Sequence, residues 1–279
     1  MMKVIGQKIH RVTGVFNIKT PDGGPPKILD LCMAPGAFLN LAMENNPEAH
    51  AQAFSLPPEK GRYKVQIQPH PNIAINFVDI NMLAADMGLD AIPQEHPEAR
   101  DFLPRNFSSE DTFDIVIADG QVLRTHHRPA YRETREAARL MFTQLAIGLE
   151  HLKPDGTMLV LLHKVEAWRC VLIMRAFCGF SDVRLFKQRG AHAKRSSCYM
   201  VASNIQSRHE DAVRAVGTWK RLWKAATFDT EEEFCRLALS LQPDVQEVLE
   251  DFGPRLVKLG REVWETQAHA LGRAPFVQG

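Results

Sequence analysis

Three apolar segments of the sequence each end in an ionisable residue. Asp79 follows INFV, Asp119 follows IVIA, and Lys164 closes the run MLVLLHK. If these segments are parallel strands, their carboxyl ends meet at one edge of a sheet, where such sheets bind ligands. An aspartate beside a partly buried lysine can orient a hydroxyl group and stabilise the negative charge that develops on its oxygen. The pattern therefore predicts that a carboxylate and an ammonium group meet at this edge.

A tight turn lies at the start of the same predicted sheet. Residues 27–38 read KILDLCMAPGAF: an apolar strand runs into Asp30, a turn contains Pro35 and Gly36, and a helical pattern begins at Ala37. Strand, sharp turn and helix form the first unit of a nucleotide-binding fold. Such a turn directs backbone N–H groups and a helix N-terminus at one small volume, so we expect a polar or negatively charged ligand there.

Several well-defined ligand motifs are missing. The turn has one glycine, Gly36, where a dinucleotide site needs G-x-G-x-x-G, and the second strand ends in Phe54-Ser55-Leu56 without an acid. Neither a P-loop nor the G-x-S-x-G elbow of hydrolases occurs. His126 and His127 have no nearby acid or cysteine to complete a ligand set, so we expect no metal.

Composition and cysteine usage are those of an intracellular globular protein. The 279 residues are 45% hydrophobic and 24% charged, and the formal net charge is +1, so binding to nucleic acid would need a local basic patch. The five cysteines are scattered and form no C-x-x-C pair, which argues against zinc and disulfides. No apolar run reaches the roughly 18 residues that span a bilayer, and no secretory signal is evident, so we expect no membrane association.

Apolar strands alternate with helical patterns over most of the chain. The predicted strands are Lys27–Cys32, His50–Leu56, Ile73–Asp79, Phe113–Asp119, Gly156–Lys164, Val183–Lys187 and Cys198–Ser203, and the predicted helices between them are Met2–Thr13, Ala37–Met43, Ala130–His151 and Ala167–Phe177. Such apolar runs are typical of parallel strands covered by helices on both faces. We therefore predict an α/β fold with a Rossmann-like seven-stranded sheet that ends in an antiparallel hairpin.

The pattern changes after residue 205. Only helical patterns remain from Gln206, and Gly253-Pro254 is expected to interrupt the last of them, Val245–Ala270. We predict a sheet domain over residues 1–205 and a C-terminal helical appendage over residues 206–279. Trp219 and Trp223 sit at helical spacing, which predicts packing on the sheet domain; docking of a protein partner on these helices is the second interpretation.

The turn from Asp30 to Phe38, of the form D-x-x-x-x-P-G-x-F, resembles motif I of S-adenosylmethionine-dependent methyltransferases, in particular the FtsJ-like ribose 2′-O-methyltransferases. Related turns carry glycine where this chain has Cys32 and Ala37. The resemblance extends from about Lys27 to Asn204 and implies a methyltransferase sheet, S-adenosyl-L-methionine as cofactor and RNA as substrate. It implies cofactor contacts by Asp30, Cys32, Met33, Ala34, Pro35, Gly36, Ala37, Phe38, Ser55, Asp79, Ile80 and Asp119.

The resemblance also assigns catalytic residues. FtsJ-like enzymes use a Lys-Asp-Lys-Glu tetrad, and Asp119 and Lys164 match its second and third places. Ser197 stands where the family has its glutamate, and a serine carries no charge. The first lysine belongs on the helix before motif I, where Lys3 and Lys8 are both candidates and the local pattern favours Lys3.

Two basic clusters flank the predicted site. One runs from Arg124 to Arg139 and includes Tyr131, which could stack on a base; the other runs from Lys187 to Arg195. Phosphate backbones attract such clusters, and unstacked bases pack on aromatic rings, so we predict that RNA binds through both. The alternative for these clusters is a solvated surface, partly neutralised by neighbouring glutamates.

Two other functions stay open. Ser197 and the loss of two glycines from the turn favour a module that kept the fold and binds cofactor or RNA with weak or no catalysis. A methyltransferase acting on a small molecule or a protein is the other possibility. Cofactor binding without turnover would identify the first, and undiminished activity after charge reversal in both basic clusters would identify the second.

Overall fold

A seven-stranded mixed sheet forms the centre of the computed structural model, which describes residues 1–20, 23–61 and 63–274. Its strands are β1 (Lys27–Asp30), β2 (His50–Ser55), β3 (Ile73–Phe77), β4 (Phe113–Ala118), β5 (Leu152–His163), β6 (Asp182–Phe186) and β7 (Ser197–Ile205). The spatial order is β3-β2-β1-β4-β5-β7-β6. Neighbours from β3 to β5 are parallel, and β7 is antiparallel to both β5 and β6. The predicted α/β sheet with its closing hairpin is confirmed.

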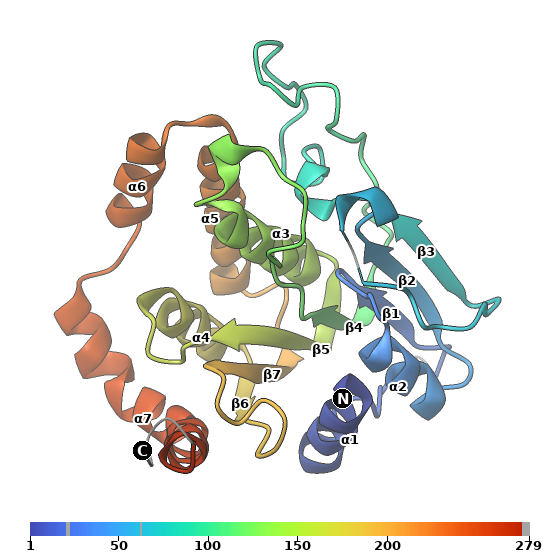
Figure 1. Cartoon of the computed structure of the whole chain (residues 1–279), viewed down its shortest axis with the longest axis vertical. Coiled ribbons are helices and arrows are strands. Elements are labelled where there is room, and N and C mark those ends of the chain that lie inside the picture. The colour runs from blue at the N-terminus through green and yellow to red at the C-terminus, as the bar shows by residue number, and fades with distance from the viewer. Residues whose placement is uncertain (21–22, 62, 275–279) are drawn as a thin grey trace.

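Helices cover both faces of the sheet. The helices are α1 (Met2–Thr13), α2 (Ala37–Asn45), α3 (Glu136–Glu150), α4 (Trp168–Phe180), α5 (Glu210–Phe228), α6 (Glu231–Ser240) and α7 (Val245–Gly272), and three 3-10 turns are η1 (Pro58–Lys60), η2 (Ile80–Met82) and η3 (Ala130–Arg132). Helices α1 and α2 lie on one face and α3, α4 and α5 on the other, with α6 and α7 farther out (Figure 1). Within the described ranges, no helix is long and apolar enough to cross a membrane.

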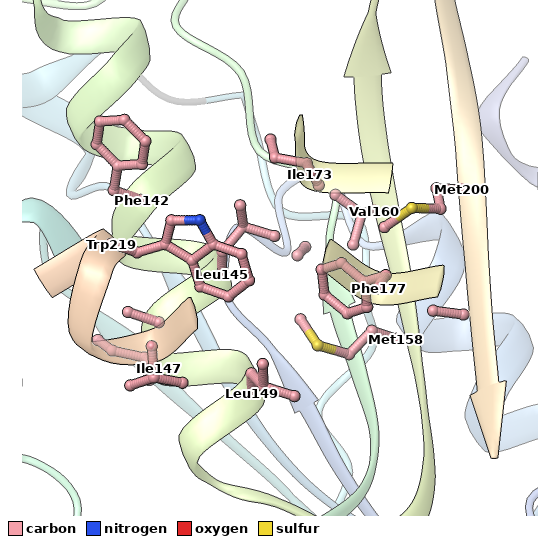
Figure 2. Packing of buried hydrophobic residues seen from close by; sticks show 14 of the residues in the cluster. Phe142, Leu145, Ile147, Leu149, Met158, Val160, Ile173, Phe177, Met200 and Trp219 are labelled. Carbon is pink, nitrogen blue, oxygen red and sulfur yellow. The ribbon is translucent and has the colours of Figure 1, made fainter. Parts of the chain in front are cut away.

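Alternation along the strands divides the buried side chains into two cores. Ile28 and Ile117 pack with α1 and α2, whereas their neighbours Leu29 and Val116 pack with α3, α4 and α5. Trp219 of α5 lies among side chains of α3, α4 and β5 in this second core (Figure 2). The C-terminal helices therefore complete the cover of the sheet rather than standing apart from it.

The strand ends differ from the expectation by one to four residues, and two helices differ in a further way. The predicted helix Ala130–His151 begins as the short turn η3, and the regular helix α3 starts only at Glu136. Helix α7 runs through Pro254 without the expected interruption. A proline in a helix removes one backbone hydrogen bond and crowds the preceding turn, and that cost can be offset by packing elsewhere along a long helix. Phe252, Leu256 and Val263 are the buried residues of α7 near and beyond that position.

The chain reverses its winding direction between β1 and β4. These strands are neighbours in the sheet although two strands separate them in sequence, so helices leave them toward opposite faces. In open α/β sheets such a reversal opens a crevice at the carboxyl ends of the strands. Asp30 ends β1 and Asp119 follows β4, so both acids are brought to this crevice.

Candidate active site

A cavity of about 620 Å³ opens at the carboxyl ends of β1, β2, β4 and β5. The residues predicted to contact a cofactor that line it are Cys32, Ala34, Pro35, Ser55, Asp79, Ile80 and Asp119. The remaining ones, which do not line it, are Asp30, Met33, Gly36, Ala37 and Phe38. A smaller cavity of about 280 Å³, bounded by Lys27 and His50, lies at the opposite edge of the sheet, away from these groups.

The turn after β1 is held by backbone and side-chain hydrogen bonds. The Cys32 N–H donates to Asp30 Oδ1 at 3.2 Å, and the Met33 N–H donates to the Phe54 carbonyl oxygen of β2 at 2.8 Å. Gly36 caps α2 with a φ of +104°, and a Cβ there would lie 2.4 Å from the Ile67 side chain. Only glycine fits that conformation and that space. Asp30 and Gly36 thus fix the shape of the turn without lining the cavity, whereas Cys32 lines it.

Cys32 occupies a place that related turns fill with glycine. Gly120, which follows the neighbouring strand β4, leaves space for the Cys32 side chain. A Cβ on Gly120 would lie 2.3 Å from Cys32 Sγ. Gly120 is held by Gln144 of α3, whose Oε1 accepts from the Gly120 N–H at 2.8 Å and whose Nε2 donates to the Gly120 carbonyl oxygen at 3.3 Å. The segment after Asp119 is therefore fixed against the thiol.

Acidic groups dominate the floor of the cavity. Withdrawal from water raises the pKa of Asp119 to about 7. Burial, followed by the charge of Asp119, raises the pKa of Asp30 well above its usual range. Burial and the same carboxylates also raise the pKa of the Cys32 thiol, which disfavours its reactive thiolate form. A bound cation would relieve the repulsion among these groups, so the floor suits a positively charged ligand.

Asp79 is held in place at the next strand end. Its Oδ1 accepts from the Asn81 N–H at 3.0 Å, and its Oδ2 lies 3.8 Å from Arg132 Nη2. Burial, followed by the charge of Glu136, raises its pKa, and Arg132 opposes that shift. The Asn81 amide in turn donates to Glu136 at 3.1 Å. Glu136 also lines the cavity, a position that the sequence patterns did not reveal.

Only some of the other predicted catalytic residues line the cavity. Lys3 pairs with Glu44 at 2.9 Å, Lys8 donates to Gln188 at 3.3 Å, and neither lysine lines the cavity. Lys164 is exposed and does not line it either, whereas its neighbour His163 does. Ser197 lines the cavity on β7, opposite His163 in the antiparallel register. The cavity thus brings together Asp119 and Ser197 but none of the three lysines.

Three of the five arginines in the first predicted RNA-binding cluster are buried, contrary to expectation. Arg132, Arg135 and Arg139 are each less than 7% exposed. Arg132 lies within ion-pair distance of Glu98, Glu136 and Asp79, Arg139 donates to Glu136 and Thr227, and Arg135 donates to the carbonyl oxygens of Tyr131 and Asp229. The Tyr131 hydroxyl donates to Glu98, and its ring is in edge contact with the His96 ring at a centroid distance of 5.6 Å. Buried charges need partners, and these cations have internal ones.

The second predicted cluster is split in the same way. Lys187 is buried, its Nζ donates to the carbonyl oxygens of Arg195 and Ser197, and burial lowers its pKa. Arg189 pairs with Glu262 of α7 at 2.9 Å. His192 and Arg195 line the cavity, and Arg195 is exposed. Arg195 is therefore the cation of this cluster that lines the cavity, and the hydrogen bonds of Lys187 hold the loop before β7 in place.

The turn, the acids and the sheet topology agree with a comparison of the sequence with known families. The profile of the FtsJ-like methyltransferases matches residues 6–205. The chain belongs to this family. No curated protein matches the FtsJ-like chain in sequence.

Solved structures share the fold of this FtsJ-like methyltransferase at low sequence identity. A provisionally named ribosomal RNA methyltransferase from Plasmodium falciparum is 14% identical over 74% of this chain and 97% of its own, with a TM-score of 0.46. Human methyltransferase-like protein 13, in complex with SAH, is 11% identical over 89% and 98% of the two chains, with a TM-score of 0.44. The N-methyltransferase NodS from Bradyrhizobium japonicum is 15% identical over 71% and 96%, with a TM-score of 0.42. These similarities concern the fold alone.

The cavity of this FtsJ-like methyltransferase suits S-adenosylmethionine, the cofactor that the family match supports. Its volume of about 620 Å³ is that of a cofactor-sized pocket. Cys32, Ala34 and Pro35 would hold the cofactor on one side, and Asp79 with Ile80 on the other. The cofactor carries a sulfonium cation, which matches the acidic floor. Among the described residues, no group of three or more histidine, cysteine or acidic side chains could hold a metal ion.

Proposed function

We propose that this FtsJ-like methyltransferase methylates the 2′-hydroxyl of RNA ribose, with Asp119 and Lys164 at the catalytic centre. The observation that carries the proposal is the place of Asp119, which lines one cavity together with the turn after β1 and with Asp79. The catalytic role of Lys164 rests on its match to the family pattern. The residue before it, His163, lines the cavity. S-adenosylmethionine supplies the methyl group, and the protein supplies position and electrostatics.

The RNA would lie across the mouth of the cavity. Arg195 lines that mouth and is exposed, and Arg124 and Lys194 are exposed on the loops beside it. These cations can still reach phosphates, whereas Arg132, Arg135, Arg139 and Lys187 are buried, and Arg128 and Arg189 pair with Glu133 and Glu262. An intracellular setting, predicted from the cysteine usage, belongs to the same proposal.

Methyl transfer from labelled S-adenosylmethionine to single-stranded RNA and to DNA of the same sequence tests this function. We expect label in RNA alone, at a position that resists alkaline cleavage, because DNA lacks the 2′-hydroxyl. Asp119→Asn should lower transfer by about 10²-fold or more, as loss of a catalytic group does. Asp101→Asn, which changes an exposed carboxylate, is the matched control and should keep its rate. Label in neither nucleic acid, or equally in both, would contradict the proposal.

A second function is favoured by a separate observation. Neither N-terminal lysine lines the cavity, and Ser197 supplies no charge where the family has glutamate. A protein that binds S-adenosylmethionine and RNA without turnover would fit this incomplete tetrad. Both functions require cofactor binding, which calorimetry measures. The labelling assay separates them, because only the first function transfers the methyl group. Transfer to a protein or a small molecule, with none to RNA, would assign a third.

A further inference from the structure

The last residue of β5 presents its side chain at the cavity, and the residue after it does not. Side chains alternate along a strand, and Leu161 and His163 both line the cavity. Lys164 lies just beyond the strand, is exposed, and has a φ of +58°, which turns the chain away from the strand direction. The geometry therefore offers an imidazole, not an ammonium group, at the carboxyl end of β5.

His163 lies next to the strands that carry the other candidate catalytic groups. Val160 of β5 pairs with Ala118, the residue before Asp119, and His163 pairs with Ser197 of β7. Its backbone is anchored, because the Cys170 thiol donates to the His163 carbonyl oxygen at 3.1 Å. The facing residue is anchored too, because Lys187 Nζ donates to the Ser197 carbonyl oxygen at 2.7 Å. The ring is therefore mounted on a rigid part of the sheet.

The imidazole ring is available for proton transfer. No side chain among the described residues forms a hydrogen bond with the ring. Lys3 and Lys8, in contrast, donate to Glu44 and Gln188. His163 is exposed at the cavity wall, and its partial withdrawal from water, followed by the charge of Lys187, lowers its pKa and so favours the neutral ring. A neutral imidazole has one ring nitrogen with a free lone pair, which can accept a proton.

We propose that His163 accepts the proton of the substrate hydroxyl during methyl transfer. This inference rests on the proposed function and assigns the base for it. As the hydroxyl oxygen bonds to the methyl carbon, the carbon–sulfur bond breaks and its electron pair stays on sulfur. The hydroxyl proton passes to the free ring nitrogen of His163, which becomes an imidazolium and later releases the proton to water. Atoms and charge balance without a further reactant.

Substitution with chemical rescue tests this assignment. His163→Ala should lower the rate constant for transfer to RNA by about 10²-fold or more. Imidazole added to the solution should restore part of it, because the cavity then has room for a free base. His50→Ala, which removes an imidazole at the opposite edge of the sheet, should stay within about threefold of the unsubstituted protein. Full activity in His163→Ala, or an equal loss in His50→Ala, would overturn the assignment.

Rescue also separates a catalytic role from a structural one. A variant that merely misfolds or misplaces β5 does not regain activity with imidazole. His50→Ala, at the opposite edge of the sheet, controls for effects of imidazole on the assay and should respond no more than the unsubstituted protein. Loss of activity in His163→Ala without rescue by imidazole would leave His163 a structural residue and contradict its role as the base.

A measurement without RNA keeps this inference distinct from the proposed function. The ring of His163, assigned by its loss in His163→Gln, is titrated by NMR with and without S-adenosylmethionine. Among the described residues, the other titratable or charged groups that line the cavity are the Met1 amino terminus, Cys32, Tyr63, Asp79, Asp119, His126, His127, Arg128, Glu136, His192, Arg195 and Tyr199, and the charge of Lys187 also acts on the ring. A sulfonium cation in the same cavity should lower the pKa of His163 by about half a pH unit or more, with a smaller effect from S-adenosylhomocysteine, whose sulfur is neutral.

Failure of the proposed function and failure of the inference on His163 give different results in these experiments. Unsubstituted protein that transfers no methyl group to RNA overturns the proposed function. If the His163 titration still responds to S-adenosylmethionine, the ring faces the reactive end of the cofactor and its place at the centre stands. If the titration does not change while calorimetry shows the cofactor bound, His163 does not face that centre and the inference fails.

Discussion

At the scale of single residues, the site is defined by carboxylates with raised pKa values. Asp119 lines the cavity and titrates near pH 7, and its charge adds to burial in raising the pKa of Asp30. Gly120 provides the space into which Cys32 projects, so the substituted turn keeps its shape without its usual glycine. The acids give the empty site a repulsion that a cation relieves, and the cofactor of the family is such a cation.

The raised pKa of Asp119 predicts that cofactor affinity depends on pH. Below pH 7 its carboxyl is protonated and neutral, and above pH 7 it is ionised and attracts a cation. Calorimetry should show S-adenosylmethionine binding more tightly as pH rises from 6 to 8, an interval about one pH unit to either side of that pKa. S-adenosylhomocysteine, which has no sulfonium charge, should change much less. Asp119→Asn should remove most of the difference, and an equal dependence for both ligands would refute this explanation.

At the scale of elements, α3 and the turn before it connect the cavity to the C-terminal helices. Glu136 lines the cavity and accepts from Arg139 Nη1 at 2.9 Å, and Arg139 Nε donates to Thr227 of α5 at 3.0 Å. Arg135 donates to the Asp229 carbonyl oxygen, which follows α5, at 2.6 Å. A stripe of arginines that the sequence alone would assign to solvent or RNA thus joins two helices.

Arg139→Met should therefore weaken folding rather than RNA binding. The substitution removes one buried partner each from Glu136 and Thr227, and breaking a buried ion pair in this way costs about 3–5 kcal/mol. Arg124→Met, at an exposed position, should change the free energy of unfolding by less than about 0.5 kcal/mol. Urea unfolding measures both. Equal stability of the two variants would show that the network around Arg139 contributes nothing.

At the scale of the whole molecule, the sheet and the C-terminal helices share one core. Trp219 stacks on Phe177 of α4 with ring centroids 5.9 Å apart, and Trp223 is fully buried. Helix α7 adds buried residues to this core, and it also contacts the loops after β6 and β5 through the Arg189–Glu262 pair and through the Trp264 indole, which donates to Glu166 at 3.1 Å. Residues 206–274 therefore contribute to the stability of the fold that carries the site.

Trp223→Ala should destabilise the entire chain in a single transition. Removing a fully buried tryptophan costs about 3–5 kcal/mol, because the lost burial is joined by the cavity left behind. Trp264→Ala, which removes a half-buried ring, should cost less. Fluorescence and circular dichroism should follow the same urea curve in both variants. Two separated transitions would instead indicate that the helices fold independently of the sheet.

Local patterns in the sequence determined the architecture and the position of the site. Apolar runs of strand length, the Pro35-Gly36 turn and the acids Asp79 and Asp119 are signals carried by a few adjacent residues, and strand ends in a parallel sheet meet at one edge for topological reasons. The tertiary structure decided which charges are free. Arg139 is buried because Thr227, 88 residues away, packs against it, and no local pattern contains that contact.

The tertiary structure also decided which residue at the end of β5 faces the cavity. Because side chains alternate, a shift of one residue in the strand end exchanges His163 for Lys164, and local patterns locate strand ends less finely than that. The pairing of His163 with Ser197 fixes the register through hydrogen bonds to a strand 34 residues later in the chain. The sequence by itself determined where the site lies, and packing between distant segments decided which side chains occupy it.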